Sequence, residues 1–311
     1  MLIGAHVSLA GGLATAVERG VERGCRAIQI FNQSPRMWRP SERGEQDVRA
    51  FREAIAQSPI EAVLIHTVYL LNCASEDRDV RAKSLTSLTH SLRVGDRVGA
   101  CGVILHPGSA KQGDVKRALA RAAQTIRAAL AESERCPLHL ENTAGAGGTL
   151  GRSIAELAEL LSAVDGGERA GLCLDSCHLL ASGYDIRTST GMDAVVEELA
   201  AEVGLERIGS LHLNDSQTPL GSNRDRHANV GQGELGDDGC AAFLGHPALQ
   251  ELTCVLETPG KDRKGASREE VAHAVALHKR GVAARRRGAR STRGSARRAG
   301  PPRRRRSTGS G

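Results

Sequence analysis

Eight short apolar runs recur along this chain, and each is followed by a longer stretch with helical patterning. The runs begin 25 to 44 residues apart and cover Leu2–Ser8, Ala27–Phe31, Ala62–Thr67, Gly102–Pro107, Leu138–Thr143, Gly171–Ser176, Gly209–Asp215 and Thr253–Thr258. Each is nearly continuous in apolar character, as expected of parallel strands that are covered on both faces. Eight strand–helix units of this kind predict an α/β fold, a closed (β/α)8 TIM barrel in preference to an open doubly wound sheet.

The segments between these runs carry helix signals. Apolar residues spaced three or four apart form one helix face at Val115, Leu119, Ala122, Ile126 and Leu130. Ser153 followed three residues later by Glu156 matches the pattern of a helix N-terminus. No GxGxxG sequence opens a helix after the first run, so we expect neither a dinucleotide-binding fold nor a nucleotide cofactor.

Positive charge is concentrated at the C-terminal end of the chain. The formal net charge is +6, but thirteen Lys or Arg residues and no acidic residue lie in 279–311, so residues 1–278 carry −7. Residues 281–311 lack apolar periodicity and are broken by Gly and Pro. We therefore predict one barrel domain over residues 1–280 and a disordered basic tail over 281–311. If the acidic part of the chain, residues 1–278, binds an anionic substrate, bound cations would be needed to make the electrostatic potential at the site positive.

We expect neither a membrane helix nor a secretion signal in this sequence. No apolar run approaches the ~18 residues that a membrane helix needs, and no basic leader precedes the apolar N-terminal residues. The eight cysteines are scattered, without a CxxC pair, which is typical of reduced thiols and disfavours a disulfide framework or a Cys–zinc site. We expect a cytoplasmic protein with no membrane partner.

Six successive predicted strands end in side chains that can ligate metals. These ends form the active-site rim of a TIM barrel. The nine candidate ligands at the ends or in the loops that follow are His66, His106, Glu141, Asp175, His178, His212, Asp225, His227 and Glu257. Their four carboxylates would repel one another unless cations neutralise them, and imidazole with carboxylate suits zinc. Nine ligands are too many for one tetrahedral ion and indicate about three ions with a bridging carboxylate.

The remaining histidines fall into two groups. His6 ends the first run and is expected at the same rim, where it could either contact substrate or support the site. The others are expected to be structural or exposed, and they are His90, His139, His246, His273 and His278.

These residues stand in motifs that resemble those of the endonuclease IV family, the zinc-dependent apurinic/apyrimidinic DNA endonucleases. The motifs are GAHVSLAGGL, FNQSPRMW, HTVYLLN, HPGS, ENTAG, LDSCHLLASGYD, HLNDS, GSNRDRHANVGQGELG and LETPG. They run from residue 3 to about residue 260, so the resemblance covers the whole barrel. One departure is Thr67-Val68 after His66, where relatives often have a more polar pair.

The resemblance implies three zinc ions per chain. His66 and His106 would hold the first, Asp175, His212 and Glu257 the second with Glu141 bridging the two, and His178, Asp225 and His227 the third. The resemblance also implies that Arg36, Tyr69 and Leu70 insert into DNA at the lesion. An aromatic and an aliphatic side chain just after a metal ligand are suited to wedge between unstacked bases. Trp38, in the loop that also carries Arg36, is expected to be a packing residue.

The implied activity belongs to base excision repair of DNA. It is hydrolysis of the phosphodiester 5′ to an abasic site in duplex DNA, leaving a 3′-hydroxyl and a 5′-deoxyribose phosphate. Zinc lowers the pKa of bound water to roughly 7 and so provides a nucleophile at neutral pH. Glu141 is then both a ligand and the expected catalytic residue, and we expect the enzyme to be a monomer.

Two other classes of protein are compatible with parts of the sequence. A sugar isomerase with a similar barrel would use a smaller metal site, which leaves the group formed by His178, Asp225 and His227 without an evident role. A non-catalytic nucleic-acid-binding protein would work through the Arg-rich tail, and its binding would depend steeply on salt and not on sequence.

Overall fold

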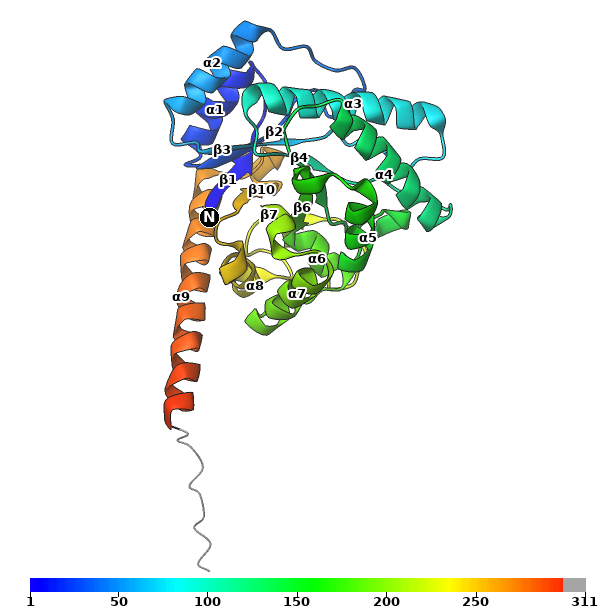
Figure 1. Cartoon of the computed structure of the whole chain (residues 1–311). Helices are drawn as coiled ribbons and strands as arrows, with labels where there is room; N and C mark the ends of the chain where they lie inside the picture. Colours follow the sequence, from blue (N-terminus) through cyan, green and yellow to red (C-terminus); the bar gives the residue numbers. More distant parts are fainter. Residues whose placement is uncertain (299–311) are drawn as a thin grey trace, which may run out of the picture.

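Eight parallel strands close into one barrel in the computed structural model, which describes residues 1–298 and the side chains as far as Gly288 (Figure 1). Around the barrel the order is β1-β10-β7-β6-β5-β4-β3-β2. The strands are β1 (Leu2–His6), β2 (Ala27–Phe31), β3 (Ala62–His66), β4 (Gly102–Leu105), β5 (Leu138–Glu141), β6 (Ala170–Asp175), β7 (Ile208–Leu213) and β10 (Thr253–Leu256). The predicted (β/α)8 TIM barrel is confirmed, and each strand lies within a residue or two of its predicted limits.

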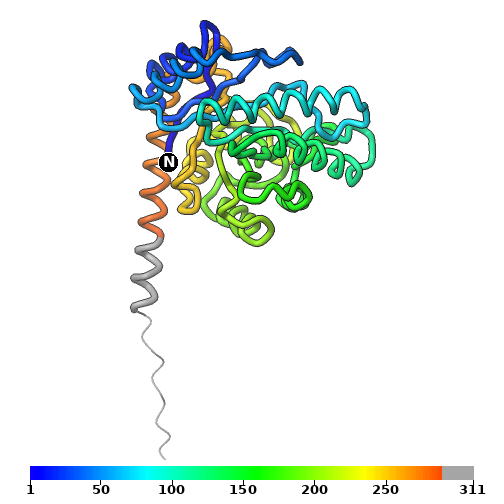
Figure 2. The backbone as a smooth tube through the Cα atoms, turned by 45° about the horizontal axis from the view of Figure 1, so that its top comes forward, coloured from blue at the N-terminus to red at the C-terminus, as the bar shows by residue number. Residues whose placement is uncertain are grey.

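Helices surround the barrel, as the tube view in Figure 2 also shows. They are α1 (Leu13–Glu22), α2 (Glu45–Ala56), α3 (Arg78–Val98), α4 (Val115–Ala131), α5 (Ile154–Val164), α6 (Ser176–Ser182), α7 (Ser189–Glu202), α8 (Gly236–Leu244) and α9 (Arg268–Arg298). Four of the five residues of the predicted apolar face, Leu119, Ala122, Ile126 and Leu130, are buried on α4, whereas Val115 at its first turn is exposed. The hydroxyl of Ser153 accepts the Glu156 N–H at 3.2 Å and begins α5, as the sequence indicates. A two-stranded ribbon, β8 (Asp215–Ser216) with β9 (His227–Ala228), follows β7.

Strand residues two apart share a face, and this alternation divides the core into two parts. Outward-facing residues such as Ile28 and Ile65 pack in the large cluster that joins the strands to the helices. The barrel interior holds a separate small apolar cluster of Ala27, Ala62, Leu64, Ile104, Cys173 and Val255. The same alternation places His66 above Leu64 and Glu257 above Val255. The barrel interior is therefore apolar at the level of Leu64 and Val255 and rich in metal-ligating side chains at the carboxyl ends of the strands.

His139 fills the barrel interior from β5. Its Nδ1 lies 3.0 Å from the hydroxyl of Ser210, and burial lowers the pKa of the imidazole to about 4. The neighbouring strands make room for it with glycines, because an added Cβ would come within 2.4 Å of the ring at Gly102 and within 2.2 Å at Gly209. His139 is thus a structural residue, as predicted.

The last helix extends further than the sequence predicted. We expect a disordered tail from residue 281, yet α9 continues to Arg298 and projects past the barrel (Figure 1). Gly281 allows α9 to touch α8, since an added Cβ would lie 2.1 Å from the carbonyl oxygen of Ala241, and Arg285 pairs with Asp193. The abundant Ala and Arg are good helix formers and support the extension. The rest of the predicted tail, residues 299–311, lies outside the described residues.

Two further features concern the helices and the cysteines. Within residues 1–298 no helix combines the length and the apolar character that crossing a membrane requires. All eight cysteines are free, and only Cys101 is exposed. The absence of disulfides agrees with their scattered spacing in the sequence.

Candidate metal centre

All nine predicted ligands converge at the carboxyl ends of the barrel strands. Six of them come from the ends of β3 to β7 and β10 or the residues just beyond, and His178, Asp225 and His227 come from α6 and the segment after β7. Three groups have ligand atoms within 4.8 Å of one another: His66, His106 and Glu141; Glu141, Asp175, His212 and Glu257; and His178, Asp225 and His227. The structure therefore assembles every candidate ligand that the sequence pattern singled out.

Glu141 stands at the centre of this assembly and is completely buried at the end of β5. One carboxylate oxygen lies 3.2 Å from Nε2 of His66 and 3.1 Å from Nε2 of His106. The other lies 3.3 Å from Nδ1 of His178 and 3.0 Å from Nδ1 of His212. Burial alone would raise the pKa of Glu141, but the surrounding imidazoles hold it well below its usual value. A single carboxylate therefore joins two of the ligand groups.

Backbone carbonyls orient several of the imidazoles. Nδ1 lies against a carbonyl oxygen in three pairs: His66 with Thr67 at 2.7 Å, His178 with Asn142 at 2.9 Å and His227 with Glu257 at 3.3 Å. Such a bond fixes the tautomer in which Nδ1 carries the proton and leaves Nε2 free to bind an ion. The chain thus presents three Nε2 atoms to the interior of the cluster.

Two of these ring nitrogens lack a hydrogen-bond partner. Nε2 of His178 and Nε2 of His227 are buried, and each lies 3.2 Å from the Asp225 carboxylate without forming a hydrogen bond. Although burial opposes the charged imidazole, the carboxylates of Asp225 and Asp175 raise the pKa of His227 to about 9. Unsatisfied imidazole nitrogens that face a carboxylate are what a divalent cation requires, so the residues fit a zinc site.

A fourth group brings the thiol of Cys177 near Asp175 and His227. Burial raises the pKa of Cys177 to about 12. A thiol that keeps its proton is a poor zinc ligand, because zinc binds the thiolate. The imidazoles and carboxylates are therefore the better zinc ligands in this cluster.

Sequence reasoning missed the amides that hold the ligands in place. The Gln29 side-chain oxygen lies 2.8 Å from Nε2 of His212, and its amide nitrogen donates to Glu257. Asn214 donates to the Asp175 carboxylate at 2.6 Å and accepts the backbone N–H of Glu257 at 2.9 Å. The available signal was a polar residue in an otherwise apolar strand, as in AIQIF for Gln29.

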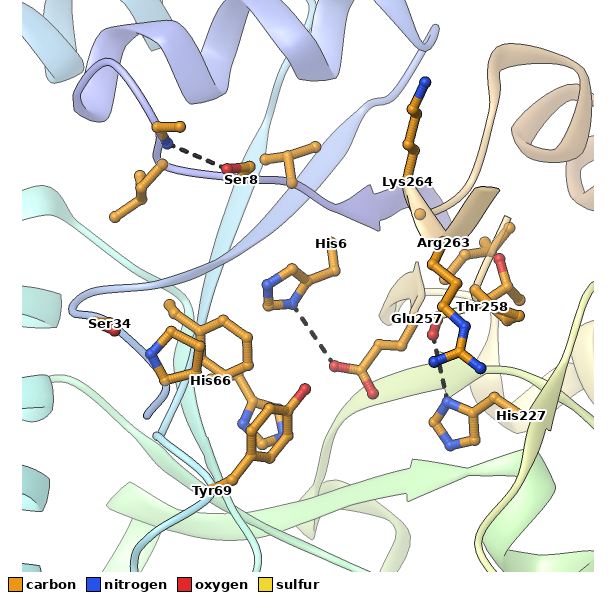
Figure 3. Close-up of a pocket in the computed structure, with 18 of the residues that line it drawn as sticks. His6, Ser8, Ser34, His66, Tyr69, His227, Glu257, Thr258, Arg263 and Lys264 are labelled. Carbon is orange, nitrogen blue, oxygen red and sulfur yellow. Dashed lines mark hydrogen bonds and ion pairs between the residues drawn. The ribbon is translucent and has the colours of Figure 1, made fainter. Parts of the chain in front are cut away.

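His6 supports the same cluster from the end of β1. Its Nδ1 lies 3.1 Å from the Gln29 amide nitrogen and 3.7 Å from the Glu257 carboxylate (Figure 3). Burial is the main cause of its lowered pKa, so the ring favours the neutral form. Of the two roles left open by the sequence, the structure provides the contacts for support and also exposes part of the ring to the cleft.

The cluster opens into a solvent-accessible cleft of about 660 Å³. Tyr69, with 71 % of its surface exposed, stands at this cleft and meets Phe31 edge-on at 5.2 Å. Leu70 and Trp38 are half-buried and line an adjoining apolar pocket of about 510 Å³. Arg36 is exposed and lines neither space. Of the three predicted DNA contacts, the structure brings Tyr69 to the cleft and Leu70 beside it.

Known proteins resemble this chain over almost the whole barrel. Residues 17–279 match the family model of xylose isomerase-like TIM barrels. A probable endonuclease 4 from Halothermothrix orenii is 35 % identical over 267 residues, covering 85 % of this chain and 96 % of that protein. Another from Halorhodospira halophila is 40 % identical over 263 residues, covering 83 % and 88 % of the two chains.

Solved structures give the same result. The crystal structure of endonuclease IV from Thermus thermophilus has a TM-score of 0.77 and 36 % identity, covering 91 % of this chain and 99 % of that chain. A D-tagatose 3-epimerase-like protein superposes with a TM-score of 0.68 at 19 % identity, which is a likeness of fold alone. Given a relationship of this extent, the chain belongs to the endonuclease IV family and is a hydrolytic nuclease.

Proposed function

We propose that this chain is a DNA-repair endonuclease that cleaves the phosphodiester 5′ to abasic sites in duplex DNA. The products would be a 3′-hydroxyl and a 5′-deoxyribose phosphate, and the enzyme would act as a cytoplasmic monomer with three zinc ions. The observation that carries the proposal is the Glu141-centred cluster, in which nine imidazole and carboxylate ligands gather and six of them line one cleft. Relatives named endonuclease 4 support the same reaction class.

The three ligand groups suggest how the ions would be held. His66 and His106 would hold one, Asp175, His212 and Glu257 a second with Glu141 shared between them, and His178, Asp225 and His227 a third. When bound, zinc activates water and offsets the charge of a phosphate group. Glu141 would fix the spacing of the first two groups, because its two oxygens face different imidazoles.

The chain's remaining residues would select and hold the damaged strand. The cleft is large enough for a sugar-phosphate unit, and an abasic sugar enters it without breaking a base pair. Tyr69 offers an exposed ring on which a neighbouring base can stack, with Leu70 and Arg36 completing the contact. Partial desolvation and the carboxylates of Glu257 and Glu141 raise the pKa of Tyr69 to about 12, so the ring stays neutral.

The direct test is incubation with a duplex oligonucleotide that holds one abasic site. We expect a single nick 5′ to that site, none in the matched undamaged duplex, and a product that a polymerase can extend from its 3′-hydroxyl. Elemental analysis of protein purified without chelator should give about three zinc ions per chain. Removing the metal should abolish nicking, and added zinc should restore it. An abasic duplex that stays intact with zinc present would rule the proposal out.

Two control reactions separate the alternatives. Sugar epimerisation would indicate that the fold-level likeness to sugar epimerases reflects function. A variant that lacks residues 282–311 should still nick, because all nine ligands precede the truncation. Loss of DNA binding on truncation, in a protein that never nicked, would instead indicate a non-catalytic DNA-binding protein.

A further inference from the structure

The loop that follows β10 forms one wall of the cleft. Its turn is closed by the Gly265 N–H, which donates to the Pro259 carbonyl at 2.9 Å. Arg23 ties the loop to the end of β1, because its guanidinium donates to the carbonyls of Lys264 at 3.0 Å and His6 at 3.1 Å. This wall is therefore fixed to the strand that carries His6.

The backbone of this loop has a demanding conformation at Arg263. Asp262 and Arg263 have φ values of 56° and 57°, in the left-handed region that residues other than glycine rarely adopt. Gly260 makes the turn possible, since an added Cβ would lie 1.8 Å from the Gly265 carbonyl oxygen. Strain of this kind persists only where surrounding contacts enforce it. The backbone of Arg263 is therefore held in one conformation, which sets the direction of its Cα–Cβ bond.

Arg263 and Lys264 both line the cleft, but the Arg263 side chain points toward His227 and Glu257, whereas that of Lys264 points away from them (Figure 3). Three guanidinium groups line the cleft. Arg23 and Arg43 donate to backbone carbonyls, while Arg263 makes no hydrogen bond or ion pair with the residues whose side chains are described. Its five N–H donors are therefore available to a ligand.

We propose that Arg263 binds a phosphate of the DNA strand that enters the cleft. This inference rests on the proposed function and adds a residue to it. A guanidinium can hold a phosphate through two parallel hydrogen bonds, and the fixed loop lowers the entropic cost of forming them. Arg263 is exposed and forms no ion pair with the residues whose side chains are described, although it lies on the side of Glu257.

The test compares Arg263→Gln with Lys261→Gln. Both remove one positive charge from the same loop, but Lys261 does not line the cleft. Binding of a duplex with an abasic site is measured across a range of salt concentrations, with metal content and single-turnover nicking measured in parallel. Arg263→Gln should weaken binding about tenfold and make the slope of log K against log salt shallower by about 0.9, the value expected for one lost phosphate contact.

Arg263→Lys should keep the original salt slope but recover only part of the affinity, because lysine keeps the charge and loses the two-pronged contact. Equal binding and equal slopes for Arg263→Gln and Lys261→Gln would overturn the inference. Loss of zinc in Arg263→Gln would also overturn it, since the residue would then act through the ligands. Failure of the proposed function is distinguishable, because the unaltered protein would then leave the abasic duplex intact.

Discussion

The side-chain oxygen of Gln29 lies 2.8 Å from Nε2 of His212, at the centre of the barrel. Both residues are fully buried, and the Gln29 amide also reaches Glu257. One glutamine from β2 thus orients two proposed ligands, one from β7 and one from the residue just after β10. Partners of this kind fix the tautomer and the direction of a metal-binding imidazole.

Gln29→Met tests this relationship. Methionine fills a similar volume but cannot accept from the imidazole, so we expect nicking activity or zinc affinity to fall about 10- to 100-fold. Zinc content and nicking of an abasic duplex are the two measurements. Gln57→Met is the matched control, because Gln57 is exposed after α2. Unchanged zinc and unchanged activity in Gln29→Met would show that Gln29 only fills space.

Glu141→Gln addresses the shared carboxylate. An amide keeps the shape but not the charge, and it cannot bridge two cations among four imidazoles. We expect a loss of activity greater than that for Gln29→Met, by more than about 100-fold, together with less bound zinc. Circular dichroism should show a retained fold. Glu159→Gln, at an exposed position on α5, should be fully active. A Glu141→Gln variant that keeps its activity would refute the bridging role.

The positions of the ligands could be predicted because two rules apply at once. Apolar runs with βα spacing predict the barrel, and a parallel barrel brings the carboxyl ends of all strands to one rim. A residue such as Glu141 or Glu257 at the end of a run is therefore expected at that rim. The structure places all nine predicted ligands at that rim.

Gln29 and α9 could not be predicted in the same way. A lone polar residue in a strand does not reveal its partners, because His212 is 183 residues away in sequence and meets Gln29 only when the barrel closes. The helix beyond Gly281 is hidden by the basic, Gly-interrupted composition of that segment, and its close approach to α8 at Gly281 cannot be recognised from the local pattern. The position of Arg263 at the cleft likewise depends on a turn that Arg23 ties to the end of β1.

Tyr69→Ala tests the proposed stacking surface. Stacking of a base on an aromatic side chain contributes about 1 to 3 kcal/mol, so binding of a duplex with an abasic site should weaken about tenfold or more. Tyr69→Phe keeps the ring and should bind almost normally. Fluorescence anisotropy with labelled duplexes measures both. Equal affinity of Tyr69→Ala and the unaltered protein would remove Tyr69 from the interface.

Gly209→Ala tests the packing around His139. The new methyl group would come within 2.2 Å of Nε2 of His139, in an interior that cannot expand. We expect the free energy of unfolding to fall by at least about 1 to 3 kcal/mol, the usual cost of overpacking. Chemical denaturation provides the measurement.

Two further variants identify the cause of that loss. Gly44→Ala should change stability little, because the new Cβ would have no neighbour closer than 3.8 Å. Combining Gly209→Ala with His139→Ala should cost less than the sum of the single changes, since the clash disappears with the ring. Additive effects would mean that Gly209 matters for another reason.

Asp96 is a candidate for a pH-dependent contribution to stability away from the metal ligands. Its carboxylate, at the end of α3, accepts the backbone N–H groups of Glu134 and Arg135 at 2.9 Å and of Cys136 at 2.7 Å. Partial burial opposes the charged form, but these three donors outweigh it and lower the pKa of Asp96 below its usual 3.8. The charged form is therefore the one that ties α3 to the segment before β5.

Asp96→Asn should lower the free energy of unfolding by about 1 kcal/mol at pH 7, a modest value because the group is half-exposed. Because the folded-state pKa lies below the unfolded value, this contribution is complete above about pH 4 and is lost as the pH falls through the folded-state pKa. Denaturation curves of variant and parent should thus converge in acid. Asp238→Asn, at an exposed ion pair with Arg280, should show neither effect. A stability difference that persists unchanged to pH 3 would mean that the side-chain shape, and not its charge, holds this junction.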